Sequence, residues 1–188
     1  MKKTNQSYFL KPLLVITTAA SFLLMTACSG VFTQKEALSE SEACEHINEL
    51  IAAHPNKFAD QKKTKRVHRM MSSWTAESPF PLARDCKVLK WGGGLHGFVC
   101  KWDSKKGMET AKADYLEGQR IMQSCLGNDW QEETITTKTG GEHARFSKSD
   151  SKTIVSIRYS RQSQGILKKW FTALYIGDNS NLTSAVQM

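Results

Sequence analysis

Cysteine is the residue type in this chain with the most chemistry to offer. The 188 residues include five cysteines, and no two of them form a Cys-x-x-Cys pair. No set of cysteines and histidines has zinc-finger spacing, so we expect no metal site. Acylation and disulfide formation are the two remaining uses of these thiols, and the segments around them decide between the two. The five are Cys28, Cys44, Cys86, Cys100 and Cys125.

The segment before Cys28 has the three parts of a secretory signal peptide. Lys2 and Lys3 give it a positive start, an apolar stretch occupies residues 12–25, and the small residues Thr26-Ala27 close it. An apolar stretch of this length followed by small residues is typical of a signal peptide rather than of a mature transmembrane helix. We therefore expect residues 1–27 to be removed.

Leu24-Met25-Thr26-Ala27-Cys28 resembles the lipobox of bacterial lipoproteins. The resemblance implies that Cys28 becomes the first mature residue and carries a thioether-linked diacylglycerol, with acyl chains that together anchor the protein stably. Ser29 follows the cysteine where an Asp would resemble an inner-membrane retention signal, which implies the periplasmic side of the outer membrane. The alternative is an ordinary signal peptide with a chance cysteine.

The other four cysteines are an even number in a chain that we expect to be exported, which favours two disulfides. Three pairings are possible. Cys86 and Cys100 flank the glycine turn 92–94 and could face each other across a hairpin, which would leave Cys44 and Cys125 to join two helices. Trp91 and Trp102 flank the same turn and could also pair across it.

Motifs for catalysis are weak in this chain. Lys138-Thr139-Gly140 and Ser149-Asp150-Ser151-Lys152 match the K-T-G and S-x-x-K motifs of penicillin-binding proteins, but in the reverse order to that family. The five histidines are scattered, and no carboxylate can be assigned to orient any of them. We therefore expect no catalytic site and no cofactor. A small hydrolase that uses a histidine such as His96 or His143 is the least favoured alternative.

A basic run between residues 57 and 69 is the clearest candidate for binding. It contains a single acidic residue, Asp60, so it would favour an anionic partner such as lipid, lipopolysaccharide or an acidic protein surface. A solvated face is the usual explanation of such a run. Trp74 lies near an expected loop, where an exposed indole could anchor a partner. The candidate binding residues are Lys62, Lys63, Lys65, Arg66, Arg69 and Trp74.

Hydrophobic periodicity predicts two helices. Ser39 and Glu42 form a capping-box pattern before a helix that ends at Pro55, and a second helix runs from Met108 to Leu126. Alternation and turn residues predict strands in the remaining segments, with one solvated face in the strand that spans residues 153–159. The segment 167–176 is apolar on both faces and suits a central strand. The predicted strands are 66–74, 86–91, 97–102, 133–139, 143–148, 153–159 and 167–176.

This order predicts an α+β fold, an antiparallel sheet with two main helices packed on one face and two disulfides. A helix followed by about three strands occurs twice, which hints at a duplicated unit. We expect four segments: the signal peptide 1–27, a lipidated tether 28–40, a single domain 41–177 and a loose tail 178–188.

The composition narrows the function without deciding it. The chain has 40% hydrophobic and 23% charged residues, which fits a globular domain. Its net charge of +8 includes Lys2, Lys3 and Lys11 of the signal peptide, and the remainder is too mildly basic for a dedicated nucleic-acid binder. We expect a lipid-anchored, non-enzymatic module that binds another protein, of inhibitor or immunity type. The alternative is an outer-membrane accessory protein whose basic patch contacts lipid or lipopolysaccharide.

Overall fold

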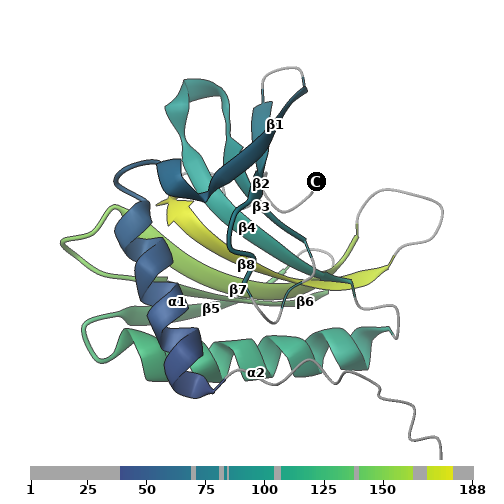
Figure 1. The fold of residues 1–188 in the computed structure, drawn as a ribbon. Coiled ribbons are helices and arrows are strands. Elements are labelled where there is room, and N and C mark those ends of the chain that lie inside the picture. Colours follow the sequence, from purple (N-terminus) through teal and green to yellow (C-terminus); the bar gives the residue numbers. More distant parts are fainter. Residues whose placement is uncertain are drawn as a thin grey trace, which may run out of the picture. The chain divides into compact units, whose positions relative to one another are not determined.

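The computed structural model describes residues 39–68, 71–80, 83, 85–103, 107–137, 140–162 and 169–179. These residues form one antiparallel sheet and two α-helices, which confirms the predicted α+β class (Figure 1). Two 3-10 turns, η1 (Ala59–Gln61) and η2 (Gly92–Gly94), connect elements in the first half. The elements are α1 (Glu40–Ala53), β1 (Lys62–His68), β2 (Met71–Ala76), β3 (Asp85–Lys90), β4 (His96–Asp103), α2 (Met108–Leu126), β5 (Gln131–Thr136), β6 (Gly141–Ser147), β7 (Thr153–Arg161) and β8 (Trp170–Asp178).

Helix α1 begins where the capping box predicted. The Glu42 backbone N–H donates to the Ser39 hydroxyl at 3.3 Å, and the Ser39 N–H donates to the Glu42 carboxylate at 2.9 Å. Both bonds satisfy N–H groups that the first turn of a helix leaves without partners. The helix ends at Ala53 with His54 as its C-cap, and Pro55 has no N–H group with which to continue the helical hydrogen bonds.

Helix α2 packs closely against the sheet. Ala111, Tyr115 and Met122 lie on its buried face, and a methyl group added at Gly118 would collide with the Ile157 side chain of β7. The Thr172 hydroxyl of β8 donates to the Ala111 carbonyl at 2.7 Å. The two helices therefore cover the same face of the sheet, over the main hydrophobic core.

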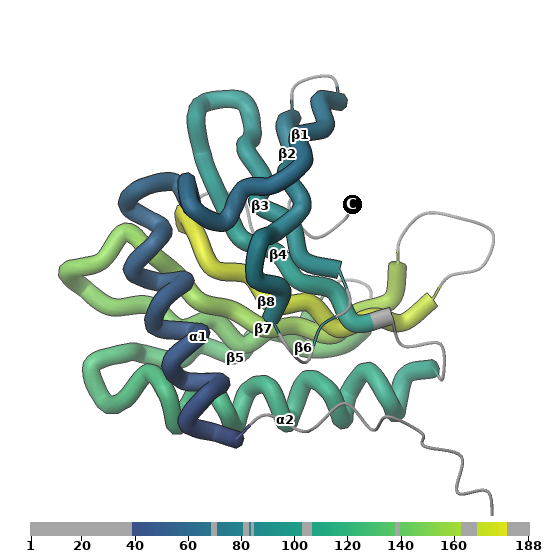
Figure 2. The backbone as a smooth tube through the Cα atoms, viewed as in Figure 1, coloured from purple at the N-terminus to yellow at the C-terminus, as the bar shows by residue number. Residues whose placement is uncertain are grey.

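The sheet has the order β1-β2-β3-β4-β8-β7-β6-β5. Each helix is followed by a four-strand meander, so the helix-plus-strands order occurs twice, with four strands in each half rather than the predicted three. The two meanders meet at the antiparallel pair of β4 and β8, in the middle of the sheet. Figure 2 shows the strand direction turning steadily from β1 to β5, as the usual twist of a sheet requires.

Both predicted disulfides are present. Cys44 of α1 is bonded to Cys125 of α2, and Cys86 of β3 to Cys100 of β4. The register places Cys86 directly opposite Cys100. The predicted pairing of Trp91 with Trp102 is wrong, because Trp91 lies beside the turn and packs in the smaller apolar cluster, whereas Trp102 lies at the far end of the hairpin against the main core.

The predicted single strand 66–74 is wrong, since the structure has two strands there. Strand β1 pairs with β2 in antiparallel register, with His68 opposite Met71. The reversal was hidden because the segment contains no Gly, Pro or Asn to mark a turn. Strand β1 is also the edge of the sheet and is exposed on both faces, so its sequence lacks the alternation that marks a half-buried strand.

Strand β7 has no solvated face, contrary to the prediction. Residues 153–157 are all buried, including Ser156 at 2% exposure. The face of the sheet opposite the helices, called here the helix-free face, carries a second and smaller apolar cluster that contains Ile154 and Tyr175. The alternation of serine with apolar residues therefore does not mark a solvent-exposed face, because both faces of β7 are buried over residues 153–157.

Strand β8 is central and buried, as predicted. It continues through Asp178, which lies opposite Thr153, so the folded domain extends past the predicted boundary at 177. Residues 180–188 of the predicted tail and residues 1–38, with the signal peptide, Cys28 and most of the tether, lie outside the described residues.

Candidate functional site

Five of the six candidate binding residues lie together on the hairpin of β1 and β2, called here the basic hairpin: Lys62, Lys63, Lys65, Arg66 and Trp74. Arg69 lies outside the described residues. The Nζ atoms of Lys62 and Lys65 are 4.6 and 5.7 Å from the centroid of the Trp74 ring, within the range of cation–π contacts. Lys63 forms a 3.0 Å ion pair with Glu77.

Trp74 is not the loop residue that was predicted. It lies within β2, partly buried against the main core, with the two lysines over its ring. Arg66 lies opposite Ser73, one position along from the Lys65–Trp74 pair, so Arg66 and Lys65 point to opposite faces of the sheet. The basic run is therefore divided between two faces.

Positive charge extends beyond the predicted run. Burial lowers the pKa of Lys62, and repulsion from Lys90 and Lys57 lowers it further. Burial also lowers the pKa of His96, and repulsion from the same three lysines lowers it further, whereas the hydrogen bond between His96 Nδ1 and the Gly94 carbonyl raises it. Lys90 was missed in the sequence because it lies at the end of β3, far from the run along the chain but close in space.

A second group of polar residues, called here the end cluster, joins one end of the sheet to α1. The His54 Nδ1 and Thr153 Oγ1 atoms are 2.7 Å apart, and His54 Nε2 lies 3.5 Å from Asp178 Oδ1. The His96 backbone N–H donates to Asp178 Oδ2 at 2.7 Å. The Tyr175 hydroxyl donates to the Asp178 carbonyl at 2.7 Å.

A hydroxyl, an imidazole and a carboxylate in this order are the groups of an acyl-transfer site. In the end cluster, however, Thr153 is 4% exposed and His54 is 7% exposed, so the hydroxyl lies beneath the surface. The arrangement instead satisfies buried polar groups where α1, β4, β7 and β8 meet. Sequence reasoning missed the end cluster because its members are far apart in the chain.

The helix-free face carries a third group of basic residues, on β6 and β7. His143 lies directly opposite Arg158, and Arg145 lies opposite Ser156 on the same face. Burial lowers the pKa of His143 to about 4, with repulsion from Arg158 and Arg145 in the same direction. Burial alone lowers the pKa of Arg158 to about 10. The His143 Nε2 atom and the Nε atoms of both arginines are buried without a hydrogen-bond partner.

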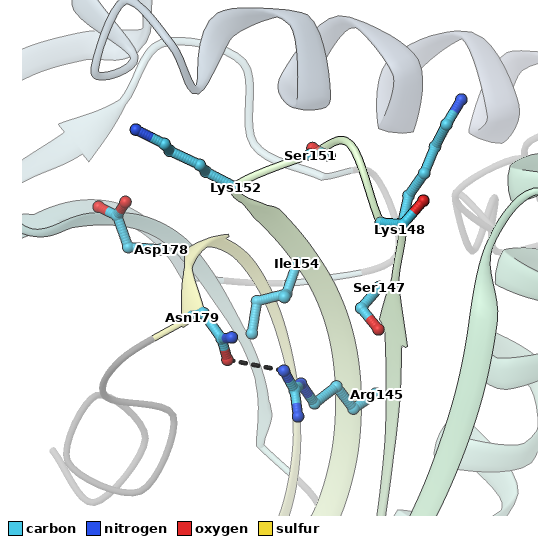
Figure 3. A pocket seen from close by; sticks show the side chains of 9 residues that line it. Arg145, Ser147, Lys148, Ser151, Lys152, Ile154, Asp178 and Asn179 are labelled. Atoms are coloured by element: carbon cyan, nitrogen blue, oxygen red, sulfur yellow. Dashed lines mark hydrogen bonds between the residues drawn. The ribbon is translucent and has the colours of Figure 1, made fainter.

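A pocket of roughly 510 Å³ opens beside this group, at the turn between β6 and β7 (Figure 3). Arg145 points along one side of it and donates to the Asn179 side chain at 2.7 Å. The side chains of Lys148 and Lys152 extend away from that pair. The lining is mainly polar and basic, which suits a charged group better than an apolar ligand: Arg145, Ser147, Lys148, Ser149, Ser151, Lys152, Ile154, Asp178 and Asn179.

Comparisons with protein-family models, curated proteins and solved structures find no match.

No helix in the described part of the chain is long and apolar enough to cross a bilayer. No group of three or more histidine, cysteine or acidic side chains within the described ranges could hold a metal ion. The candidate sites thus reduce to the basic hairpin, the end cluster and the basic group on the helix-free face.

Proposed function

We propose that the protein is a lipid-anchored envelope protein that binds another protein without catalysis, as an inhibitor or immunity protein, on the periplasmic side of the outer membrane. The observation that carries the proposal is the helix-free face, where Arg145, Arg158 and Phe171 are partly exposed in a domain that two disulfides cross-link. Arginine and aromatic residues are enriched at the centres of protein interfaces. A stiff sheet presents such side chains at little entropic cost on binding.

Charge supports a partner with an acidic surface. The basic hairpin and the basic group on the helix-free face are both positive, and complementary charge speeds association and selects partners. The basic hairpin also favours the second candidate, an outer-membrane accessory role, because Lys62 and Lys65 over Trp74 combine cations with an amphipathic ring. The hydrolase alternative has less support, since the hydroxyl of the end cluster is buried.

A capture experiment tests the first candidate. The full-length protein, purified in mild detergent with its disulfides intact, is used as bait against native envelope and secreted fractions, and retained proteins are identified by mass spectrometry. We expect the bait to retain one protein at a near-stoichiometric amount. The same protein should bind in an assay with the two purified proteins, and that assay is then used to measure inhibition of the captured protein. Retention of no specific protein would count against the binding function.

Vesicle binding separates the second candidate from the first. Vesicles that contain phosphatidylglycerol are mixed with the C28S protein, which lacks the proposed anchor, and with a C28S protein in which Lys62, Lys63, Lys65 and Arg66 are also changed to Gln. A lipid role predicts that the second protein loses most of the binding that the first one shows. Equal binding by the two proteins would remove the main reason for the lipid role.

A further inference from the structure

We infer that His143, Arg145 and Arg158 on the helix-free face form a site for a carboxylate carried by an acidic segment of the partner protein, with Phe171 as its aromatic side. The inference rests on the proposed function and names the chemistry of the partner at that surface.

The three basic residues share one face of two neighbouring strands. His143 and Arg158 are direct cross-strand partners, and Arg145 is the next residue along β6 on that face. Arg145 has a 3.5 Å contact with the exposed Glu133 and a hydrogen bond to Asn179. Among the described residues, no carboxylate lies within ion-pair distance of Arg158. The positive charge of the three residues is therefore not balanced by carboxylates of the described chain around them.

Burial makes this imbalance costly. The Nε atoms of Arg145 and Arg158 and the Nε2 atom of His143 have neither solvent contact nor a hydrogen-bond partner. A buried charged donor without an acceptor destabilises a fold, so such groups call for an explanation in the function of the site. A guanidinium is a planar fork of donors, and its best-matched ligand is a planar carboxylate.

Phe171 of β8 defines one side of the site. The Arg158 Cζ atom and the Lys101 Nζ atom each lie 5.5 Å from the centroid of the Phe171 ring. The ring thus holds two cations, and its apolar surface lowers the local dielectric constant. A carboxylate that enters beside it would be attracted more strongly than one on an open surface.

The recessed position favours an acidic protein segment over a membrane headgroup. The site lies on the face of β6, β7 and β8, each of which has a strand on both sides, whereas the lysines that a flat bilayer would meet lie on edge strand β1. The neighbouring pocket, which Arg145 and Ile154 help to line, leaves room for a peptide to approach along β6. Alternate side chains of an extended peptide point the same way, so acidic residues two positions apart can face one sheet.

Two peptides that differ only in charge test the site. Acetyl-Glu-Phe-Glu-amide and acetyl-Gln-Phe-Gln-amide are titrated into the full-length protein in detergent, and binding is followed by calorimetry and by the nitrogen-15 signals of the arginine Nε–H groups. We expect saturable binding of the Glu peptide alone, with shifts at Arg145 and Arg158. Equal binding of the Gln peptide, or unshifted arginine signals, would overturn the carboxylate site.

Variants then assign the binding to the named residues. We expect R158Q to weaken binding of the Glu peptide at least tenfold, and R145Q to weaken it less, since Arg145 already has partners. R161Q is the matched control, because Arg161 is an exposed arginine at the end of the same strand, and we expect it to bind like the wild type. Circular dichroism checks the fold. If R158Q does not fold, R158K is tested in its place. Lysine keeps the positive charge but lacks the planar guanidinium, so an unchanged affinity of R158K for the Glu peptide would contradict the proposal.

The outcomes separate this inference from the proposed function. If the bait captures a dedicated protein whose affinity is the same for wild type, R145Q and R158Q, the carboxylate site is wrong and the binding function stands. If the Glu peptide binds through Arg158 but no protein is retained, the site stands and the binding function fails. If phosphatidylglycerol vesicles shift the Arg158 signal and the Glu peptide does not, the ligand is a headgroup and the inference is wrong.

Discussion

The surroundings of His143 make the stability of the folded domain depend on pH. Its imidazole is partly buried with Nε2 out of solvent contact, and Arg158 and Arg145 repel a positive charge there, so the folded state holds it neutral with a pKa of about 4 against an ordinary value of 6.5. Between these two values the unfolded chain binds a proton that the folded chain does not bind. Acid therefore lowers the free energy of unfolding through this residue, while above about pH 8 neither state binds the proton and the dependence vanishes.

We predict a loss of about 2 kcal/mol through His143 between pH 6.5 and pH 5, from the difference in proton binding. Urea unfolding at several pH values measures it, and H143Q should remove most of the slope. His46 and His96 also have lowered pKa values and leave a smaller slope in the same direction. H68Q is the control, because His68 is exposed. An unchanged slope in H143Q would show that the folded state does not lower the pKa of this imidazole.

The Thr153 hydroxyl provides a second test at this scale. We predict that T153V lowers the free energy of unfolding by about 1–3 kcal/mol, because valine keeps the shape but leaves His54 Nδ1 buried without its partner. Thermal and urea unfolding measure the change. T75V on an exposed position of β2 should alter stability by less than about 0.5 kcal/mol. Equal effects of the two substitutions would mean that the end cluster contributes no stability.

Between elements, the two disulfides differ in what they join. The Cys44–Cys125 bond spans 81 residues and links the helices of the two halves, whereas the Cys86–Cys100 bond spans 14 residues within a hairpin that strand pairing already closes. A longer loop loses more entropy in the unfolded state when it is closed.

We therefore predict that the paired change C44A with C125A destabilises the protein by about 1.5 kcal/mol more than C86A with C100A, the difference expected from loop length. Urea unfolding of the two double variants under identical oxidising conditions gives the comparison. A larger loss for the hairpin disulfide would show that packing around the buried sulfurs of Cys86 and Cys100 outweighs chain entropy.

Edge strand β1 carries four basic residues in seven positions, and no strand of the described part of the chain pairs with its outer side. Charged side chains on an edge discourage pairing with other chains. We predict that changing Lys62, Lys63, Lys65 and Arg66 to Gln increases self-association, measured by analytical ultracentrifugation of the full-length protein in detergent. The control removes the same charge from four other positions, Lys112, Lys152, Arg161 and Lys169, and should leave the mass distribution unchanged. Equal self-association of both variants would assign the effect to net charge alone.

Elements defined by local signals were predictable, and those defined by long-range packing were not. The capping box of Ser39 and Glu42 and the periodicity of α2 are encoded within a few residues, and both helices were found. Strand β7 was correctly located. Its second buried face belongs to an apolar cluster that also contains Tyr175 of β8 and Leu89 of β3, and the sequence does not show that these strands come together. The end cluster could not be found because residues 54, 96, 153 and 178 meet only after the sheet is assembled.

For the whole molecule, the predicted anchor decides where every other feature acts. We predict that C28S abolishes incorporation of a fatty-acid label and moves the protein from the membrane fraction to the soluble periplasmic fraction, since serine cannot form the thioether. Metabolic labelling and cell fractionation measure both effects. C28S should unfold at the same urea concentration as the wild type, because Cys28 precedes the folded domain. Unchanged labelling would show that the lipobox resemblance is coincidental.

The cysteine pairs are nested along the chain, with Cys86–Cys100 inside Cys44–Cys125. In a chain exported as proposed, the amino-terminal part emerges first, so Cys44, Cys86 and Cys100 reach the oxidising compartment while Cys125 is still on the other side of the membrane. An oxidase that joined cysteines in their order of arrival would then bond Cys44 to Cys86. The observed pattern would require either that β3 and β4 pair before oxidation or that an isomerase repairs the error, so maturation would depend on the order in which translocation, folding and oxidation occur.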